Sequence, residues 1–182
     1  MNRSLPILAL FAAVFLAGPA LGQQKRISPH ETISAVCAGD RVTITYGRPY
    51  TKAPRGGEMR KIWGGLVPYG KAWRTGADEA TLLITQQPIM IGETTIPAGA
   101  YTLYTVPMES GASKLVFSKR LGQWGIPVDE KNDLARVDMT KSDMETKVDQ
   151  FTMAVDKSAT GGVIKLMWEN TQFSVPFTVV KN

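Results

Sequence analysis

The chain has 182 residues and a formal net charge of +5, and it contains one cysteine and one histidine. Its 21 Lys and Arg residues are spread along the sequence without a basic block, so the charge gives no support to nucleic-acid binding. One Cys and one His cannot complete the shell of about four ligands that a zinc or copper site needs, which argues against that class of metal centre.

The start of the chain has the pattern of an export signal. A positively charged beginning is followed by an apolar run over residues 5–17, and Ala20 and Gly22 place small residues at the minus-three and minus-one positions of a cleavage site. The run is shorter than the roughly 20 residues of a membrane-spanning helix, and no later stretch is long enough, so we expect no transmembrane segment in the mature chain. We therefore expect residues 1–22 to be a cleaved signal peptide, residues 23–182 to form a single domain, and the protein to be periplasmic or secreted.

The rest of the chain is dominated by a period of two, the repeat of a half-buried strand. Apolar and polar side chains alternate in RVTITYG at 41–47 and in QFSVPFTVV at 172–180. Further short stretches of this kind, separated by turn-forming segments rich in Gly, Pro and Ser, occupy residues 80–86, 100–106, 114–119, 148–156 and 162–169. The pattern predicts an all-β fold, an antiparallel β-sandwich of about seven to nine short strands.

Two places depart from this alternation. Short helical turns are predicted near residues 57–65 and 138–147, and at most one or two such turns are expected in the whole domain. Pro176 lies inside the last predicted strand but has no backbone N–H to donate. We therefore expect that strand to lie at a sheet edge or to carry a bulge.

Three side chains have a predicted degree of burial. Cys37 lies in the alternating stretch TISAVCA and has no second cysteine to pair with, so we expect it to be a buried thiol. Trp168 alternates in phase with Ile164 and Leu166, which predicts a place in the core. Trp124 lies in a turn and is expected to be exposed.

Several motifs in this chain are shared with a known family. They are ITYGRP at 44–49, KIWGGLVPYGKAWRTGADEAT at 61–81, IPAGAYTLYTVP at 96–107, Trp124-Gly125, Arg136, and MWEN followed by VPF near the C-terminus. In wording and order they closely resemble the DUF2911 family of uncharacterised exported bacterial proteins, over nearly the whole mature chain. The resemblance implies a signal-bearing protein with one β-rich domain, and it carries no established activity, cofactor or site residue.

Sequence signals for catalysis are missing. The only histidine, His30, lies near the start of the mature chain, and no GxSxG or SxxK motif accompanies it as a nucleophilic hydrolase requires. The EF-hand calcium loop, the phosphate loop and the dinucleotide-binding fingerprint are also absent. We expect no cofactor and no metal, and the sequence leaves open whether any reaction is catalysed, with the balance against it.

The stretch YGKAWRTGADEAT at 69–81 is the strongest candidate for a functional site. It combines aromatic rings, a guanidinium group and two neighbouring carboxylates around a glycine turn. A second arginine follows Tyr46-Gly47 at the end of a predicted strand. The candidate ligand-binding residues are Arg48, Tyr69, Trp73, Arg74, Asp78 and Glu79.

The same residues allow a structural and a functional interpretation. In the structural one, Arg74 or Arg48 pairs with one of the two carboxylates and ties a long connection to the sandwich, with Trp63 and Trp73 filling the core. In the functional one, the arginines grip a carboxylate or phosphate group while an aromatic ring such as Tyr50 faces a sugar or aromatic ring of the ligand.

The sequence favours an exported binding or interaction module for a small anionic or carbohydrate-like ligand or an envelope partner. One alternative is a periplasmic hydrolase that acts on a carbohydrate or cell-envelope substrate through Glu79 and Asp78. Adjacent residues of an extended strand point to opposite faces, which is unfavourable for the facing carboxylates of a glycosidase. A second alternative is a structural subunit that docks by an edge strand.

We predict that export cleaves the chain after Gly22, because Ala20 and Gly22 have the small side chains that the cleavage site requires. N-terminal sequencing of the exported protein should find Gln23 as its first residue. An exported protein that still begins at Met1 would contradict the prediction.

Overall fold

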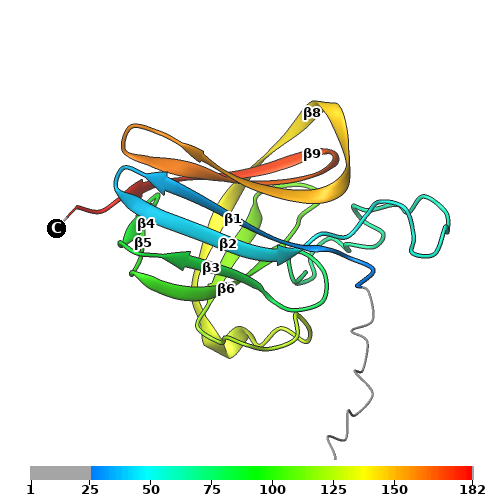
Figure 1. Cartoon of the computed structure of the whole chain (residues 1–182), viewed down its shortest axis with the longest axis horizontal. Coiled ribbons are helices and arrows are strands. Elements are labelled where there is room, and N and C mark those ends of the chain that lie inside the picture. Colours follow the sequence, from blue (N-terminus) through cyan, green and yellow to red (C-terminus); the bar gives the residue numbers. More distant parts are fainter. Residues whose placement is uncertain (1–25, 182) are drawn as a thin grey trace, which may run out of the picture.

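The computed structural model describes residues 26–181, and the expected cleavage site lies outside these residues. The described part is all-β and antiparallel, as predicted (Figure 1). Its only helical element is one 3-10 turn, η1 (Glu130–Asn132). The strands are β1 (His30–Cys37), β2 (Asp40–Gly47), β3 (Thr81–Thr85), β4 (Ile89–Ile91), β5 (Thr94–Ile96), β6 (Gly99–Val106), β7 (Ser113–Ser118), β8 (Asp133–Lys157) and β9 (Gly161–Val179).

The strands form an open sandwich in the order β1-β2-β3-β6-β7-β8-β9-β4-β5. Strand β8 belongs to both layers, because its residues 133–139 pair with β7 and its residues 140–157 pair with β9. In Figure 1, β8 and β9 cross above β1 and β2, and the two layers enclose the core between them. The long shared strand therefore extends well beyond the one strand, residues 148–156, that the sequence predicts in this region.

The core follows from the alternation of side chains. On β2, Val42, Ile44 and Tyr46 are buried while the residues between them are partly exposed. Trp168 on β9 is fully buried, which confirms its predicted place in the core. Burial of apolar side chains is worth about 1.5 to 3 kcal/mol for each large residue and is the main source of stability here.

The two predicted helical turns are wrong. Residues 138–147 belong to β8, where Thr140 is aligned with Ser174 and Asp143 with Thr171. A short polar helix here would have no apolar face to pack and would be marginally stable in water. Pairing with β9 instead stabilises the segment as a strand, so the tertiary partner decides the conformation. Residues 57–65 contain turns and isolated bridges, one of which joins Lys52 to Met59.

The prediction that the last strand lies at a sheet edge is also wrong. Strand β9 lies between β8 and β4, and the breaks in regular pairing fall on β8. Pro176 lies between Ser174, which is aligned with β8, and Thr178, which is aligned with β4. No aligned pair of either ladder includes the proline, so its missing N–H is tolerated there.

The hairpin of β1 and β2 turns through only Ala38 and Gly39, both with positive φ, of 50° and 94°. Such two-residue turns match the twist of the strands they join. Cys37 precedes this turn and is fully buried, as predicted, and burial raises the pKa of its thiol.

A buried carboxylate links this hairpin to the turn that follows β3. Asp40 is fully buried and accepts a hydrogen bond of 2.6 Å from the hydroxyl of Thr85. It also accepts the backbone N–H groups of Gln86 and Gln87 at 2.8 and 2.9 Å. One side chain therefore satisfies three donors that strand pairing leaves free.

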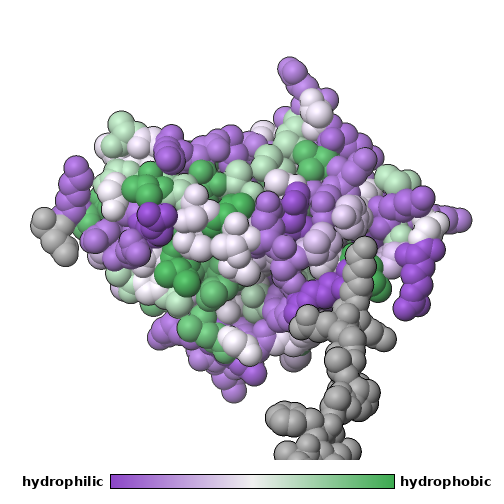
Figure 2. Space-filling view, in the orientation of Figure 1, coloured by the Kyte–Doolittle hydropathy of each residue, from purple (hydrophilic) through white to green (hydrophobic). Residues whose placement is uncertain are grey.

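The outer face of the sheet is mixed in character. Figure 2 shows hydrophobic residues interspersed with hydrophilic ones over the face that carries β1 to β3. Val36, Ile84 and Met90 are exposed to 42%, 40% and 41%. Single exposed apolar residues of this kind are normal on a solvated protein surface.

We predict that Asp40→Ala destabilises the fold by about 2 kcal/mol, because the buried hydroxyl of Thr85 and two part-buried backbone N–H groups lose their acceptor. The urea midpoint of the variant should fall well below that of the wild type. The control Glu109→Ala removes a carboxylate from an exposed turn and should leave the midpoint unchanged. Equal midpoints for the two variants would contradict the role given to Asp40.

Candidate functional site

The candidate residues lie on the long connection between β2 and β3, residues 48–80. This connection has no regular strand or helix, but it is anchored at several points. The backbone of Thr51 donates to Asp149 at 2.7 Å, and Trp73 exchanges two backbone hydrogen bonds of 2.7 and 2.8 Å with Thr105. The connection therefore runs along the sandwich as an ordered layer of its own.

Aromatic rings hold the connection against the core. Trp63 is buried and stands edge-on to Trp73, with ring centroids 5.9 Å apart. The ring of Trp73 stacks on Trp168 at 5.9 Å and meets Phe151 edge-on at 5.0 Å. The indole N–H of Trp168 donates to the hydroxyl of Thr51 at 3.0 Å. These contacts agree with the structural interpretation of Trp63 and Trp73, and they leave Trp73 half-buried.

A pocket of about 680 Å³ opens beside this aromatic cluster. Trp73 and Trp168 contribute aromatic rings to its wall. Its cationic lining consists of Lys52, Arg55, Arg60 and Arg74, and Asp78 is the only carboxylate among the lining residues. Further apolar side chains come from Ile27, Pro49, Tyr50, Pro54, Leu66, Pro68 and Ile126.

The end of the connection has an unusual backbone. Thr75 and Asp78 have positive φ values of 56° and 64°, which L-residues other than glycine seldom adopt. Gly76 has a φ of 148°, and a Cβ there would lie 2.7 Å from the carbonyl oxygen of Gly47. The left-handed conformation of Asp78 interrupts the alternation of an extended chain. Asp78 and Glu79 each offer a ligand atom within 4.8 Å of the other and of His30.

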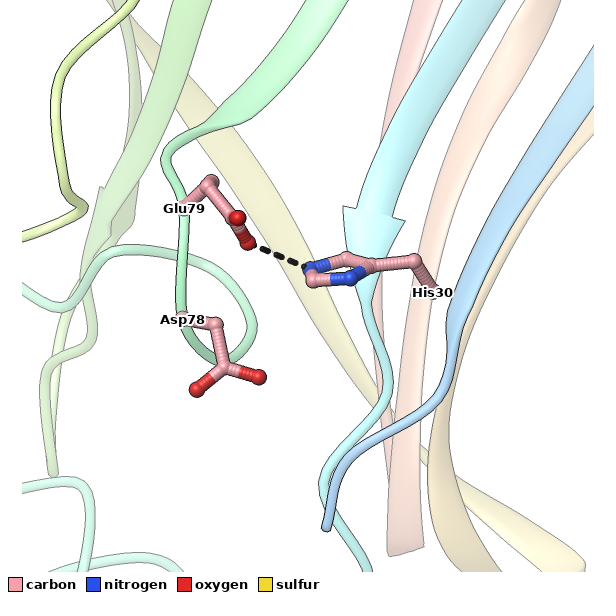
Figure 3. A group of neighbouring side chains, drawn as sticks. All are labelled: His30, Asp78 and Glu79. Atoms are coloured by element: carbon pink, nitrogen blue, oxygen red, sulfur yellow. Dashed lines mark ion pairs between the residues drawn. The ribbon is translucent and has the colours of Figure 1, made fainter. Parts of the chain in front are cut away.

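The histidine reaches this place because Gly47 has no side chain. His30 begins β1 and is paired with Gly47 at the end of β2. A Cβ on Gly47 would lie 2.1 Å from the carbonyl oxygen of Ala77 and 2.9 Å from Nε2 of His30. Close packing of three neighbouring chain segments thus brings the imidazole to the carboxylate of Glu79 (Figure 3).

Glu79 is the centre of a small ionic network. Arg26 donates to both of its carboxylate oxygens, at 2.5 and 2.6 Å, and Nε2 of His30 lies 3.1 Å away. The hydrogen bonds from Arg26 are the main cause that lowers the pKa of Glu79 to about 2, from an ordinary value of 4.5. The carboxylate is therefore ionised throughout the neutral range.

His30, Asp78 and Glu79 form a donor set that could hold a divalent cation, because imidazole and carboxylate groups are ordinary ligands of such ions. Both oxygens of Glu79 are bonded to Arg26, whose guanidinium supplies positive charge at this place. A metal ion would have to displace Arg26. The geometry thus favours an ion pair over a metal centre.

Half of the candidate residues named from the sequence line the pocket. Trp73, Arg74 and Asp78 do so. Arg48, Tyr69 and Glu79 are not among its lining residues. The pocket therefore includes the centre of the predicted stretch and excludes its two ends.

The ion pairs differ from those considered in the structural interpretation. Arg48 pairs with Glu31 at 3.0 Å and donates to the carbonyl of Phe151, while Arg74 donates to the backbone carbonyl of Asp78 at 3.5 Å. Neither arginine is paired with the carboxylate of Asp78 or Glu79 among the ion pairs of the described residues. The partner of Glu79 is Arg26, 53 positions away in sequence, which only the strand order brings close.

Sequence reasoning also missed most of the cations around the pocket. Residues 50–77 contain six Lys and Arg residues but only one carboxylate, Glu58. The remainder of the chain has 21 − 6 = 15 basic and 16 − 1 = 15 acidic residues. Residues 50–77 therefore have a formal charge of 6 − 1 = +5, equal to that of the whole chain, and their depletion in carboxylates was the signal that could have located this segment.

The family described as "Protein of unknown function (DUF2911)" matches residues 28–177. The chain belongs to the DUF2911 family. The matched region of this DUF2911 protein includes the whole connection and every lining residue of the pocket except Ile27. No curated protein matches it, and no solved structure matches it. Among residues 26–181, no helix is long and apolar enough to cross a membrane.

We predict that Glu79→Gln lowers the stability of this protein at neutral pH by removing the ion pair with Arg26. The folded pKa of Glu79, about 2, lies below its ordinary value of 4.5, so the pair stabilises the wild type above about pH 4.5 and the effect is lost as the pH falls towards 2. Urea titrations of both proteins should show a difference that shrinks on acidification. A difference that stays constant down to the pKa of Glu79 would contradict the prediction.

Proposed function

We propose that this DUF2911 protein is a binding module whose pocket takes small amphipathic anions, molecules with one anionic group and an apolar or ring-bearing body. The observation that carries the proposal is the composition of the pocket wall, which contains four cationic side chains, one carboxylate and the half-buried ring of Trp73. Binding pockets for such molecules are typically apolar, with a few polar groups that orient the ligand.

The charge of the wall favours an anionic ligand. Lys52 and Arg55 are exposed at the pocket. Arg60 is held in place because it donates to the carbonyl oxygens of Tyr50 and Thr51. Cations that surround a partly apolar pocket attract a carboxylate, sulfonate or phosphate group more strongly than the same cations in open water.

The remaining wall favours an apolar or cyclic body. The half-buried ring of Trp73 is fixed by stacking on the buried Trp168 and by its edge-on contact with Phe151, so it offers a preorganised surface. Little conformational entropy is lost when a ligand packs on rings that are already rigid. A volume of about 680 Å³ lies within the range of about 300 to 1,000 Å³ found for drug-sized ligands.

Hydrolysis through Glu79 and Asp78 receives less support. A general acid must hold a proton near the working pH, whereas Arg26 keeps the pKa of Glu79 at about 2. Glu79 is also not among the lining residues of the pocket. Binding without a reaction is therefore the function that the geometry supports best.

Binding is tested with 8-anilinonaphthalene-1-sulfonate, a fluorescent aromatic anion, and with the uncharged N-phenyl-1-naphthylamine as its matched neutral probe. We expect saturable binding of the anion. Arg55→Gln and Lys52→Gln should each weaken it about two- to fivefold, because an exposed charge pair contributes about 0.5 to 1 kcal/mol. Binding of the neutral probe should not change in these two variants.

Two further variants complete the test. Ala72→Phe places a ring in the pocket wall and should weaken both probes, whereas Lys141→Gln removes a charge from the distant part of β8 and should affect neither. Equal thermal midpoints exclude partial unfolding as the source of fluorescence. Anion binding that is insensitive to Arg55, Lys52 and Ala72 would show that the pocket is not the binding site.

A further inference from the structure

Exposed apolar side chains are concentrated around the mouth of the pocket. Among the described residues, the pocket wall contains four of the large hydrophobic side chains that are strongly exposed, namely Ile27, Tyr50, Leu66 and Ile126, at 54%, 45%, 44% and 53%. Two more lie just outside it. Met59 precedes the pocket residue Arg60 and is 58% exposed, and Trp124 is two positions from Ile126 and is 54% exposed, as its turn position predicts.

This group of side chains differs from the single apolar residues on the outer sheet face. Four of its six members line one pocket and the other two are close to lining residues in sequence, and exposed apolar side chains gathered in this way mark a place where another molecule docks. We call these six residues, together with the cations described next, the rim.

The rim is also the most cationic part of the chain. Besides the pocket residues, Lys61 and Lys71 on the same connection are exposed. The backbone N–H of Leu66 bonds to the carbonyl of Lys61 at 2.9 Å, so apolar and cationic side chains stand next to each other. Glu58 is the only carboxylate in residues 50–77, and this part of the connection has a net charge of 6 − 1 = +5.

Exposed apolar side chains next to cationic ones are typical of proteins that bind the surface of a membrane. Apolar side chains with Trp and Tyr enter the boundary between lipid headgroups and acyl chains, while Lys and Arg remain at the headgroups with anionic lipids. A peptide that adds to a sheet edge needs free backbone donors and acceptors. The rim presents side chains of a connection whose backbone groups at Thr51, Ala53, Arg60 and Trp73 are already paired.

We propose that the rim docks on membrane surfaces that contain anionic lipids, with Trp124, Met59 and Leu66 at the headgroup boundary. Docking places the mouth of the pocket against the lipid layer. It goes beyond the proposed binding of small anions and does not require that the pocket be occupied.

The test is flotation of the exported protein with vesicles of phosphatidylcholine alone or mixed with phosphatidylglycerol. We expect binding to the mixed vesicles only, and loss of that binding at high salt because salt screens surface charge. Lys61→Gln and Lys71→Gln should each lower the partition coefficient onto the mixed vesicles about fivefold, because one cation near an anionic surface contributes about that factor to binding. Met59→Ser should weaken it as well.

The variants are chosen so that the two proposals fail separately. Lys61, Lys71 and Met59 do not line the pocket, so their substitution should leave binding of the naphthalene sulfonate unchanged. The matched controls are Lys119→Gln and Ile84→Ser, an exposed cation and an exposed apolar residue away from the rim, which should float like the wild type. Unchanged flotation in all three rim variants overturns membrane docking, whatever the probe shows.

A second readout locates the contact. Lipids with a brominated acyl chain should quench the emission of the wild type, and Trp124→Phe should remove most of that quenching, since Trp63 and Trp168 are buried and Trp73 is half-buried in the pocket wall. Quenching that survives in Trp124→Phe overturns the stated orientation. Equal flotation with both kinds of vesicle also overturns the proposal. Absence of flotation with either kind overturns it too, and would leave a protein partner as the occupant of the rim.

Discussion

The packing of Trp73 between Trp63, Trp168 and Phe151 is the contact on which the connection of residues 48–80 and its pocket depend. The connection of residues 48–80 has no strand or helix to give it a fixed path. Its aromatic side chains replace that support, since they bury large rings in the core of the sandwich and stack in fixed geometry. The connection thereby becomes a rigid wall, and the same rings that hold it also face the pocket.

A second constraint acts at the end of the connection. Gly47 and Gly76 allow backbone segments to approach more closely than any side chain would permit, and Asp78 takes a left-handed conformation. Strain of this kind is retained where surrounding structure over-determines it. Its effect is to bring His30 and Glu79 together, and Arg26 closes the network so that Ile27 and Ser28 form part of the pocket wall.

Charge and shape then act in the same place. Residues 50–77 have a formal charge equal to that of the whole chain, and they belong to the connection that the fold leaves outside the regular sheet. The side chains of a strand are constrained by packing against the neighbouring strands. The side chains of a connecting segment carry less of this constraint, and binding residues are therefore often found on such segments. The DUF2911 domain thus separates a stabilising sandwich from a cationic, aromatic layer suited to binding.

The sequence by itself determined the all-β class, the burial of Cys37 and Trp168 and the exposure of Trp124, because a period of two is local information that each strand carries alone. It also named Trp73, Arg74 and Asp78, which line the pocket. Only the tertiary structure decided that residues 138–147 form part of β8, that Pro176 lies between two ladders, and that Glu79 binds Arg26. These features depend on which segments become neighbours in space. The alternation of side chains within a strand carries no information about the strand that will pair with it. Strand order, by contrast, places Arg26 and Glu79, 53 positions apart, within hydrogen-bond distance.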